Sequence, residues 1–558
     1  MNIDFASASL NAAARADGSN HRIPIIVGVT GHRDLIPADL DGIKERVRSF
    51  FGLLRSRFPH TPFQLYSGLA VGADQLVAQM AASCSIEVVP VLPMPASIYV
   101  NDFREDEEGL RTFEEFIATR SPIELKLHDD SNAELIAADR SRMSIYSKRQ
   151  YATLGNFLAV RCHVLLALWD GIESSEVGGT GFTIDSTRNG RLEGDATLVD
   201  PVEGGLIYHI PVGRRRDPSA RPSPNDRFIV TTTSEAFLSA LSEIDRYNAF
   251  PKLGGYGETN AEHAYRHADR LAMIFQRRVR RLRVAVFGCI TALISSYAVY
   301  SEYGHPQAAL VVYLAALALG AAIWVIDRKA AIEQRFLDYR TLAEALRIQN
   351  IWTKAMIHLS VADYYLRKHR SELRWIRFAL RGFASTMAIV ELLRMRRIVP
   401  PPSAANLDKT TVEMWMREQH EYFSLTSKKR ERRLKALRRA ATGVYALGIV
   451  AATFALALPF SETLALREHE IILMMGMFPA LAGTIGAWIK QTAIVEEAAH
   501  ARVMQSLFGL ALQEWIRPDG RSSKAAIVRH LGVEALYENA DWLALRRSRP
   551  IEAPLGSG

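Results

Sequence analysis

The stretch QRRVRRLRVAVFGCITALISSYAVY at residues 276–300 places five arginines directly before a segment that contains no charged residue. That segment, 284–300, is the shortest of four uncharged stretches, and the others lie at 308–326, 440–460 and 471–489. Each is roughly as long as a helix must be to cross the hydrocarbon core of a bilayer. Short joints connect the first pair and the second pair. The sequence therefore predicts an all-α membrane region with four transmembrane helices in two hairpins.

Basic residues gather at one end of these predicted helices. A second basic run, KKRERRLKALRR, precedes the third stretch at 428–439, and Arg328, Lys329 and Lys490 follow the second and fourth stretches. The two hairpin tips contain a single Lys or Arg between them, Arg467. This asymmetry follows the positive-inside rule, so we expect an inner-membrane protein with both termini in the cytoplasm rather than a soluble bundle of buried helices. The juxtamembrane arginines also attract anionic lipid, which makes the bilayer an expected partner.

The overall composition narrows the class of protein. The chain has 558 residues, 48% of them hydrophobic and 23% charged, so it is long enough for about three domains and is neither disordered nor fibrous. The juxtamembrane runs account for the formal net charge of +8, so direct binding of nucleic acid is not expected. Three distant cysteines, Cys84, Cys162 and Cys289, argue against a disulfide framework and against a cysteine-based zinc site.

Short apolar runs alternate with segments of helical spacing between residues 23 and 215. The run VLLALW at 164–169 is apolar throughout, as expected for a strand that is buried on both faces of a parallel sheet. This alternation predicts an α/β Rossmann-like N-terminal domain. The predicted organisation is a disordered tail at 1–22, this domain at 23–215, a linker at 216–261, a first helical hairpin region with an amphipathic helix at 262–399, a linker at 400–427, a second hairpin region at 428–549 and a tail at 550–558.

The two hairpin regions resemble each other. Trp324 ends the first pair of apolar stretches and Glu333 follows nine positions later, while Trp488 ends the second pair and Glu497 follows at the same distance. This pattern suggests an internal duplication. Between the halves, residues 375–395 are moderately apolar but contain charges, which predicts an amphipathic cytoplasmic helix at the membrane surface.

The interior of the predicted membrane helices contains no Asp, Glu, Lys, Arg or His, which disfavours a proton-coupled pump or transporter. Small residues recur at helical spacing, as at Ala316 and Gly320 in the second helix and at Gly476, Ala480 and Gly483 in the fourth. Such residues let helices approach closely, either within one hairpin or between subunits. We expect the chain to form a homo-oligomer.

Three glycine-rich turns follow predicted strands in the N-terminal domain. They are GVTGHR at 28–33, SGLAVGAD at 67–74, and the segment that runs from DG at 170–171 to GGTG at 178–181. Strand ends of this kind form the ligand crevice of an open parallel sheet, and their free N–H groups suit a phosphate. Each turn alone is common, and neither GxGxxG nor the P-loop pattern is present. The candidate ligand-binding residues are Gly28, Thr30, Gly31, His32, Arg33, Ser67, Gly68, Gly72, Ala73, Asp74, Asp170, Gly171, Gly178, Gly179, Thr180 and Gly181.

Several of these side chains also have ordinary structural roles open to them. Asp74 opens a helix and can act as its cap, and His32 can be a structural hydrogen-bond donor. Trp169 and Tyr151 can stack on a base or pack in the core. The HAYRH segment at 263–267 has the one suggestive metal-ligand spacing, and a solvated helix face is favoured there, so neither a metal nor a cofactor is expected to be required.

The motifs GVTGHRDL, SGLAVGADQLVA, VVPVLPMP and LWDG…GGTG, in this order, resemble the SLOG domains, Rossmann-like modules related to the Smf/DprA and "lonely guy" proteins. The basic helix before each hairpin, YRTLAEALRIQNIW and the closing ENADWLALRRSRP resemble the two-spanning SLATT domains. The resemblance covers about 23–215 and 262–549. It implies binding of a nucleotide or nucleotide sugar at 28–33, 67–74 and 178–181. It also implies a membrane-disrupting effector in bacterial antiphage or abortive-infection defence that a nucleotide signal triggers.

One departure from the resemblance bears on activity. Hydrolytic relatives carry a glutamate just after their glycine-rich PGGxGT turn, whereas GGTG is followed here by FTID at 182–185. This favours binding over hydrolysis and leaves Asp74, Asp170 and Asp185 as candidate acids. We therefore expect a nucleotide-sensing membrane effector that permeabilises the inner membrane, with a nucleotide or an ADP-ribose-type molecule as its ligand. The alternatives are a membrane-anchored nucleotide or NAD-type N-glycosidase, similar to phosphoribohydrolases, and a structural membrane scaffold with a vestigial nucleotide fold.

Overall fold

The structure is a computed structural model that divides into two compact units. The first unit comprises Met1–Arg266 with His358–Asn406, and the second comprises His267–Ile357 with Leu407–Gly558. The residues that the structure describes are 22–125, 127, 133–138, 145–173, 176–190, 205–217, 225–229, 234–251, 260–355, 357, 360–364, 373–382, 409–460, 462–517 and 524–548. The predicted tails at 1–22 and 550–558 fall almost entirely outside them. Of the predicted linker at 400–427, residues 400–408 also lie outside them, but residues 409–427 form the start of helix α15 (Lys409–Ala457), so most of this segment is helix and not linker.

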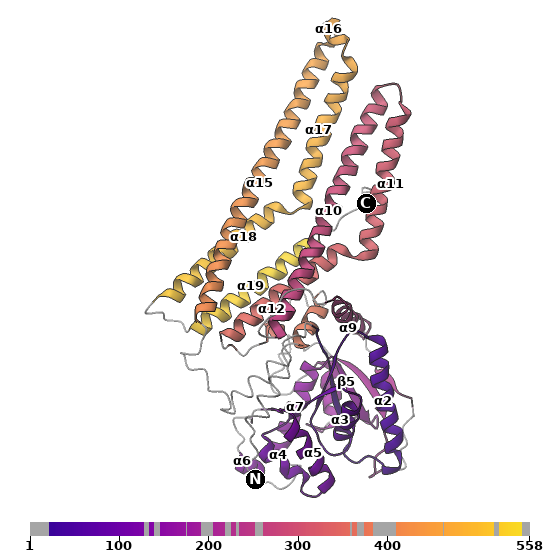
Figure 1. Ribbon diagram of the computed structural model, residues 1–558, viewed down its shortest axis with the longest axis vertical. Coiled ribbons are helices and arrows are strands. Elements are labelled where there is room, and N and C mark those ends of the chain that lie inside the picture. Colours follow the sequence, from indigo (N-terminus) through magenta and orange to yellow (C-terminus); the bar gives the residue numbers. More distant parts are fainter. Residues whose placement is uncertain are drawn as a thin grey trace. The chain divides into compact units, whose positions relative to one another are not determined.

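A seven-stranded sheet forms the centre of the first unit (Figure 1). Its strands are β1 (Ile25–Gly31), β2 (Phe63–Ser67), β3 (Glu87–Leu92), β4 (Ile123–Glu124), β5 (Val164–Trp169), β6 (Leu206–Pro211) and β7 (Arg227–Ile229). The spatial order is β4-β3-β2-β1-β5-β6-β7, and every neighbouring pair is parallel except β6 with β7. The chain runs outward from β1 to β4 and then returns to the other side of β1 with β5. This reversal creates a topological switch point between β1 and β5 and confirms the predicted α/β Rossmann-like fold.

Helices cover this sheet because their apolar faces meet buried strand residues. One core cluster includes Ile26 of β1, Tyr66 of β2 and Leu158. A second joins Trp169 of β5 to Ile184, so Trp169 is a core residue, which was one of its two predicted roles. The helices of this part are η1 (Pro37–Asp39), α2 (Leu40–Arg57), α3 (Ala73–Ser83), α4 (Ala96–Tyr99), η2 (Val100–Phe103), α5 (Glu107–Thr119), α6 (Ala133–Ala138), α7 (Ile145–Arg161), α8 (Thr180–Asn189) and α9 (Ser234–Asn248).

The N-terminal unit extends beyond the predicted boundary at residue 215. Helix α9 lies in the predicted linker, and the Asn248 side chain at its end accepts a hydrogen bond from Ile23 N at 2.8 Å and donates one to Ile23 O at 2.9 Å. Thr61 Oγ1 also donates to Asp245 of α9, at 2.7 Å. Since these polar groups hold the start of β1 and the chain before β2, α9 is an integral part of the α/β domain.

Residues 373–382 also belong to this unit, although the sequence analysis assigned 262–399 to a hairpin region and 375–395 to the membrane surface. His163 accepts from Ile26 N at 2.8 Å through Nδ1, and its Nε2 lies 2.9 Å from Phe378 O. The Phe378 ring stacks on Phe237 of α9 with centroids 5.2 Å apart. The apolar face of this segment is therefore buried in protein, which corrects the predicted domain boundary, and residues 383–395 lie outside the described part of the chain.

The second unit consists of long helices. They are α10 (Asn260–Glu302), whose first residues belong to the first unit, α11 (Gln307–Ala330), α12 (Ile332–Lys354), α15 (Lys409–Ala457) with η4 (Leu458–Phe460), α16 (Glu462–Ala465), α17 (Glu468–Gln491), α18 (Ile494–Ile516) and α19 (Lys524–Arg547), while α13 (Val361–Tyr364) lies in the first unit. Helices α10 with α11 and α15 with α17 form two hairpins (Figure 1). Four helical segments are long and apolar enough to cross a membrane, at Glu262–Glu302, Gln307–Ala330, Lys409–Phe460 and Glu468–Ile516.

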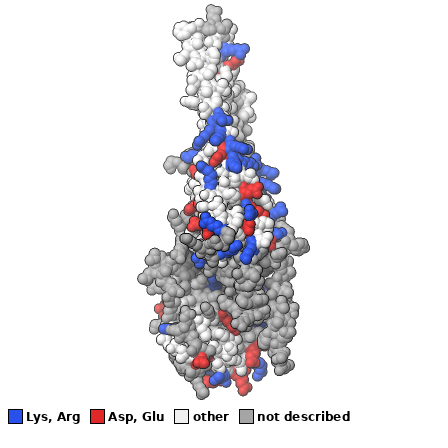
Figure 2. Space-filling model, turned by 90° about the vertical axis from the view of Figure 1, so that its left-hand side faces the viewer, with Lys and Arg blue, Asp and Glu red and all other residues white. Residues whose placement is uncertain are grey.

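The surface of these hairpins fits a lipid environment. Large apolar side chains such as Val311, Leu314 and Leu456 are exposed, with 63%, 54% and 76% of their surface accessible. In a soluble bundle such side chains would be covered. Figure 2 shows a hairpin surface almost free of charge, apart from a small group near the tip, and a band of Lys and Arg toward the opposite end of this unit. The four predicted membrane helices are thus confirmed as candidate spans.

The two halves of the second unit repeat one geometry, which supports the predicted internal duplication. Ala331 separates α11 from α12 with φ of 48°, and Ala493 separates α17 from α18 with φ of 47°, both left-handed conformations that are rare for alanine. Just after these turns, Glu333 pairs with Arg283 of α10, and Glu497 pairs with Arg430 of α15. Each half therefore closes its hairpin with the same kink and the same type of ion pair.

Small residues bring helices together within the second hairpin, although not all of those singled out above. Gly448 of α15 packs against Pro479 of α17, where an added Cβ would lie 2.8 Å from the proline ring. Gly476 and Gly483 have open space around them among the described residues. Packing within a hairpin thus depends on Gly448, and these two glycines of α17 are open to lipid or to another helix.

Candidate functional site

The candidate site lies where β1, β2 and β5 end, beside the switch point of the sheet. Gly31 at the end of β1 pairs with Leu168 of β5, and an added Cβ at Gly31 would come within 2.8 Å of Leu168 O. Gly72 has φ of 91°, and a Cβ there would lie 2.5 Å from Arg33 O. The turns at 28–33 and 67–74 are therefore packed directly against each other, as their predicted placement at one edge requires. Gly31 and Gly72 allow this close contact because they have no Cβ atom.

Arg33 connects the first turn to the third. Its guanidinium lies over the ring of Tyr151 at 5.4 Å and donates to Asp102 Oδ2 at 3.4 Å. Tyr151, on α7, also donates its hydroxyl to Asp102. Gly178, with φ of 81°, fits against this same tyrosine, since an added Cβ would lie 2.9 Å from Tyr151 Cβ. All three predicted turns thus converge around Arg33 and Tyr151.

The electrostatics of this cluster favour a charged arginine. Burial opposes the charge of Arg33, but Tyr99, Tyr151 and Asp102 outweigh it, so the pKa of Arg33 is raised. Burial raises the pKa of Tyr151 as well. Asp102 comes from η2, a segment without any glycine-rich or catalytic pattern, so sequence reasoning had no signal for it.

Asp74 occupies the first turn of α3 and is buried. Burial raises the pKa of its carboxyl to about 7, although Arg33 and the backbone at Ala70 act in the opposite direction. Its Oδ2 lies close to Gly68, where an added Cβ would be 3.0 Å away. Gly72 is the N-cap residue of α3, so Asp74 lies within the first turn of this helix and not at its cap position. The edge of the sheet thus holds one carboxyl group that titrates near neutral pH.

Ser67 serves the backbone of its own turn. Its Oγ donates to Asp74 O and accepts from Leu69 N, both at 3.1 Å. The neighbouring carbonyl of Gly68 accepts a hydrogen bond from Tyr99 at 3.1 Å. Ala73 begins α3 directly against the chain at His32, to whose carbonyl its N–H donates at 3.1 Å. The second turn is therefore a rigid backbone structure.

His32 and Asp170 form a second polar pair at the ends of β1 and β5. His32 Nε2 lies 3.1 Å from Asp170 Oδ1 and 3.1 Å from Asp170 N, and burial lowers the pKa of this histidine. Arg214 lies 3.7 Å from Asp170 Oδ2 and 2.9 Å from Asp34 Oδ1. Arg214 lies at the end of the predicted domain at 23–215, outside the three glycine-rich turns, so no motif pointed to its role. Asp170 is thus held by two side chains and by Ile172 N.

The third turn leads into the N-terminus of α8, of which Gly179 is the preceding residue and Thr180 the first. Free N–H groups at Thr180 and Gly181, with the helix dipole, suit an anion. Asp185, by contrast, is exposed on α8 and pairs with Arg188 and Asn189 of the same helix. It is the least suited of the three candidate acids.

Two predicted glycines, Gly28 and Gly171, take no part in the packing of the three turns against one another. Gly28 lies inside the sheet, where an added Cβ would be 2.6 Å from the Cys162 sulfur, so it permits strand packing. Gly171 is exposed with open space around it. Thr30, another predicted residue of this edge, is buried.

The convergence offers an arginine, an aromatic ring, a helix N-terminus and a protonatable carboxyl, which together suit a phosphorylated ligand with a ring system. Within the described part of the chain, no three His, Cys, Asp or Glu side chains gather in a group that could hold a metal ion. Comparison of the chain with protein-family models, with curated proteins and with solved structures finds no match. The functional conclusion therefore depends on the site itself.

Proposed function

We propose that the chain is a nucleotide-sensing membrane effector. Its α/β domain, which resembles SLOG domains, binds a nucleotide or an ADP-ribose-type ligand at the edge formed by β1, β2 and β5. The observation that carries this proposal is the convergence of three glycine-rich turns around Arg33, with Tyr151 joining the first turn to the third. The guanidinium and the N-terminus of α8 supply charge and N–H donors for phosphate, and the tyrosine ring offers a surface on which a base can stack.

The helical unit is the proposed effector. Its spans carry no charged residue in mid-membrane, which fits a role in packing and permeability better than one in proton transport. We infer that the basic ends face the cytoplasm of a bacterial cell, that the spans lie in the inner membrane, and that several copies assemble. Ligand binding shifts the packing of the spans and permeabilises the membrane, which requires that the ligand bind one conformer more tightly than the other. The resemblance to SLATT domains supports the proposal that this response serves antiphage defence.

The test uses the full chain in lipid nanodiscs, because α9 and residues 373–382 are part of the α/β domain. The protein is incubated with mono-, di- and cyclic nucleotides, NAD and ADP-ribose, and mass spectrometry reports what remains bound and whether it is intact. Arg33→Gln is expected to weaken binding about tenfold or more, since it removes a charge-assisted phosphate contact. Arg188→Gln, which removes an arginine of α8 paired with Glu173, is the control and retains binding. Absence of any bound compound would contradict the proposal.

Asp74 favours one alternative, a membrane-anchored N-glycosidase. A carboxyl whose pKa lies at about 7 is suited to protonate a leaving base at neutral pH. If the chain is this enzyme, the same incubation releases free base, and Asp74→Asn stops the release while the nucleotide still binds. An intact ligand in the parent protein removes this alternative and leaves the sensor.

A further inference from the structure

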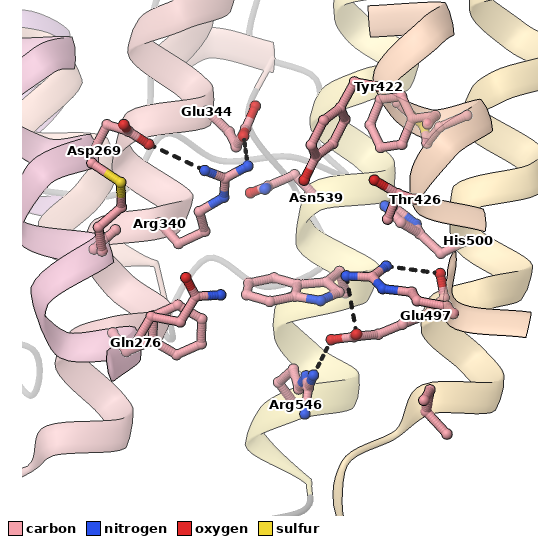
Figure 3. Close-up of a pocket in the computed structure, with 18 of the residues that line it drawn as sticks. Asp269, Gln276, Arg340, Glu344, Tyr422, Thr426, Glu497, His500, Asn539 and Arg546 are labelled. Carbon is pink, nitrogen blue, oxygen red and sulfur yellow. Dashed lines mark hydrogen bonds and ion pairs between the residues drawn. The ribbon is translucent and has the colours of Figure 1, made fainter. Parts of the chain in front are cut away.

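The second unit contains a cavity of about 860 Å³ among α10, α12, α15, α18 and α19 (Figure 3). A volume of this size is typical of small-molecule sites. The cavity lies next to the end of the fourth span, since Trp488 contributes to its wall. It draws on both repeated halves, with Arg340 and Glu344 from the first half and Glu497 and His500 from the second. Helix α19 adds Arg546 and connects the two.

The carboxylates of this cavity are already engaged. Glu344 pairs with Arg340 and Arg347, and although burial opposes its charge, these arginines hold its pKa below the usual value. Arg340 also reaches Asp269 at 3.2 Å. Figure 3 shows Asp269, Arg340 and Glu344 together on one side of the cavity.

The second half also contributes an acid that is paired with two arginines. Glu497 pairs with Arg430 at 3.0 Å and with Arg546, and less than an eighth of its side-chain surface is accessible. In the first half the corresponding acid, Glu333, pairs with Arg283, which lines the cavity. None of these acids is left to neutralise further positive charge.

Four more basic side chains line the cavity. Arg277 and Arg280 come from α10, and Lys429 and Arg433 come from α15. All four are exposed, and among the residues that the structure describes none of them has an ion-pair partner. Lys and Arg side chains also form a band on the surface of this unit (Figure 2). The cavity therefore has excess positive charge, contributed by both hairpins. These like charges repel each other, and an anion bound between them would offset the repulsion.

A buried donor supplies a second, independent indication. Trp415 of α15 lines the cavity and is only 6% exposed, yet its indole Nε1 has no hydrogen-bond partner among the described residues. A buried N–H of this kind is normally satisfied. Its side chain carries a donor only, as do the arginine and lysine side chains around it. The wall thus offers donors from its arginines, from its lysine and from this indole N–H.

We propose that this cavity binds a phosphate-bearing anion that links the two hairpin halves. Phosphate matches the wall because it accepts several hydrogen bonds and pairs with arginine in a bidentate manner. The ligand has two possible sources, an anionic lipid headgroup that enters from the bilayer and a soluble phosphate compound. This site is separate from the edge of the α/β sheet and does not depend on the nucleotide-sensing proposal.

The experiment measures binding to the full chain in nanodiscs with two probes. In one arm, inorganic pyrophosphate is titrated into protein in phosphatidylcholine nanodiscs, and tryptophan fluorescence is followed because Trp415, Trp488 and Trp542 line the cavity. In the other arm, protein from mixed phosphatidylcholine and phosphatidylglycerol nanodiscs is analysed by native mass spectrometry for retained anionic lipid. Retention of the lipid alone identifies a headgroup as the ligand, and a response to pyrophosphate alone identifies a soluble phosphate.

A matched pair of variants separates a built site from general attraction to basic residues. The cavity variant is Arg277→Gln, Arg280→Gln, Lys429→Gln and Arg433→Gln. The control removes the same charge from the same helices at exposed positions outside the cavity wall, with Arg281→Gln, Lys428→Gln, Arg432→Gln and Arg438→Gln.

We expect the cavity variant to lose binding about tenfold or more and the control to lose less than about threefold, because only the former removes direct contacts. Trp415→Phe, which keeps the ring and removes the N–H, is expected to weaken binding by about threefold. Equal losses in the cavity variant and its control, or no binding of either probe by the parent, would overturn the proposal.

Discussion

The edge of the α/β sheet and the cavity of the helical unit use arginine in opposite ways. At the edge, Arg33 has Asp102 and Arg214 has both Asp34 and Asp170 as partners. In the cavity, the acids are paired with some of the arginines. The basic residues that have no ion-pair partner in the described part of the chain are Arg277, Arg280, Lys429 and Arg433. At the sheet edge the arginine charges are balanced by acids, so a ligand is selected by shape and by a few polar contacts. In the cavity part of the positive charge is unbalanced, so anions are attracted by charge. The two sites therefore respond differently to mutation, pH and salt.

The largest loss of stability is expected from a change to Glu497, which pairs with two arginines in the cavity wall. Glu497→Gln leaves Arg430 and Arg546 in place without their acid, and it should destabilise the helical unit by about 3–5 kcal/mol, because a buried charge loses its counter-charge. Thermal unfolding of the full chain in detergent measures this loss. Glu413→Gln removes an exposed ion pair with Arg417 on α15 and should cost less than about 1 kcal/mol. Similar losses for both variants would mean that Glu497 does not hold the cavity.

The sheet edge should be sensitive to steric change in its turns. Gly72→Ala places a Cβ at a φ of 91° and 2.5 Å from Arg33 O, so the turns must separate and about 3 kcal/mol of stability should be lost. Gly171→Ala has nearly the same φ, 87°, but open space, and should cost only about 1–2 kcal/mol. Urea unfolding followed by a probe in the α/β domain compares the two. Equal costs would show that the turns are not packed tightly against each other.

Much of this architecture could be predicted from the sequence. The parallel sheet was predicted from the apolar run of β5 and from the glycine-rich turns after β1 and β2. A strand that is buried on both faces is apolar throughout, and this can be seen in the sequence of the strand itself. The uncharged spans were equally clear, and the spacing from Trp324 to Glu333 and from Trp488 to Glu497 matches two kinks with nearly identical φ. Patterns of this kind involve residues that are close in the chain, so they can be recognised in a single sequence.

Contacts between distant segments could not be predicted. Asn248 bonds to Ile23 across 225 positions, and His163 meets Phe378 across 215. Asp102 of η2 meets Arg33 across 69 positions, and no motif precedes it. The apolar face of 373–382 was assigned to the membrane surface because apolar periodicity does not distinguish a lipid surface from a protein surface.

A further contrast should appear in the pH dependence of stability. The pKa of Asp74 is raised by burial from 3.8 to about 7, so the unfolded chain releases this proton more readily than the folded chain. The contribution of Asp74 to stability is therefore fully present below about pH 4 and is lost as pH rises to about 7. Asp74→Asn should gain stability relative to the parent over this range, as thermal unfolding at several pH values measures. A difference that is constant with pH would contradict the raised pKa.

The smallest contrast concerns salt. Pyrophosphate binding to the cavity should weaken several-fold when ionic strength rises from about 0.1 M to about 1 M, because the screening length falls from about 10 Å to about 3 Å. Nucleotide binding at the neutralised edge should change by less than about threefold over the same range, because Arg33 is partly buried and already paired. Titrations at both ionic strengths test this contrast. A stronger salt effect at the edge would reverse the proposed difference between the two sites.

The most direct test of the central claim couples ligand binding to the membrane. The full chain is reconstituted in liposomes loaded with a self-quenched dye, and each nucleotide that mass spectrometry finds bound is added to the outside and the inside of the vesicles. The account predicts dye release with the bound nucleotide and no release from Arg33→Gln, while Arg188→Gln releases dye like the parent. Binding of an intact nucleotide without any change in permeability, in the parent protein, would contradict it.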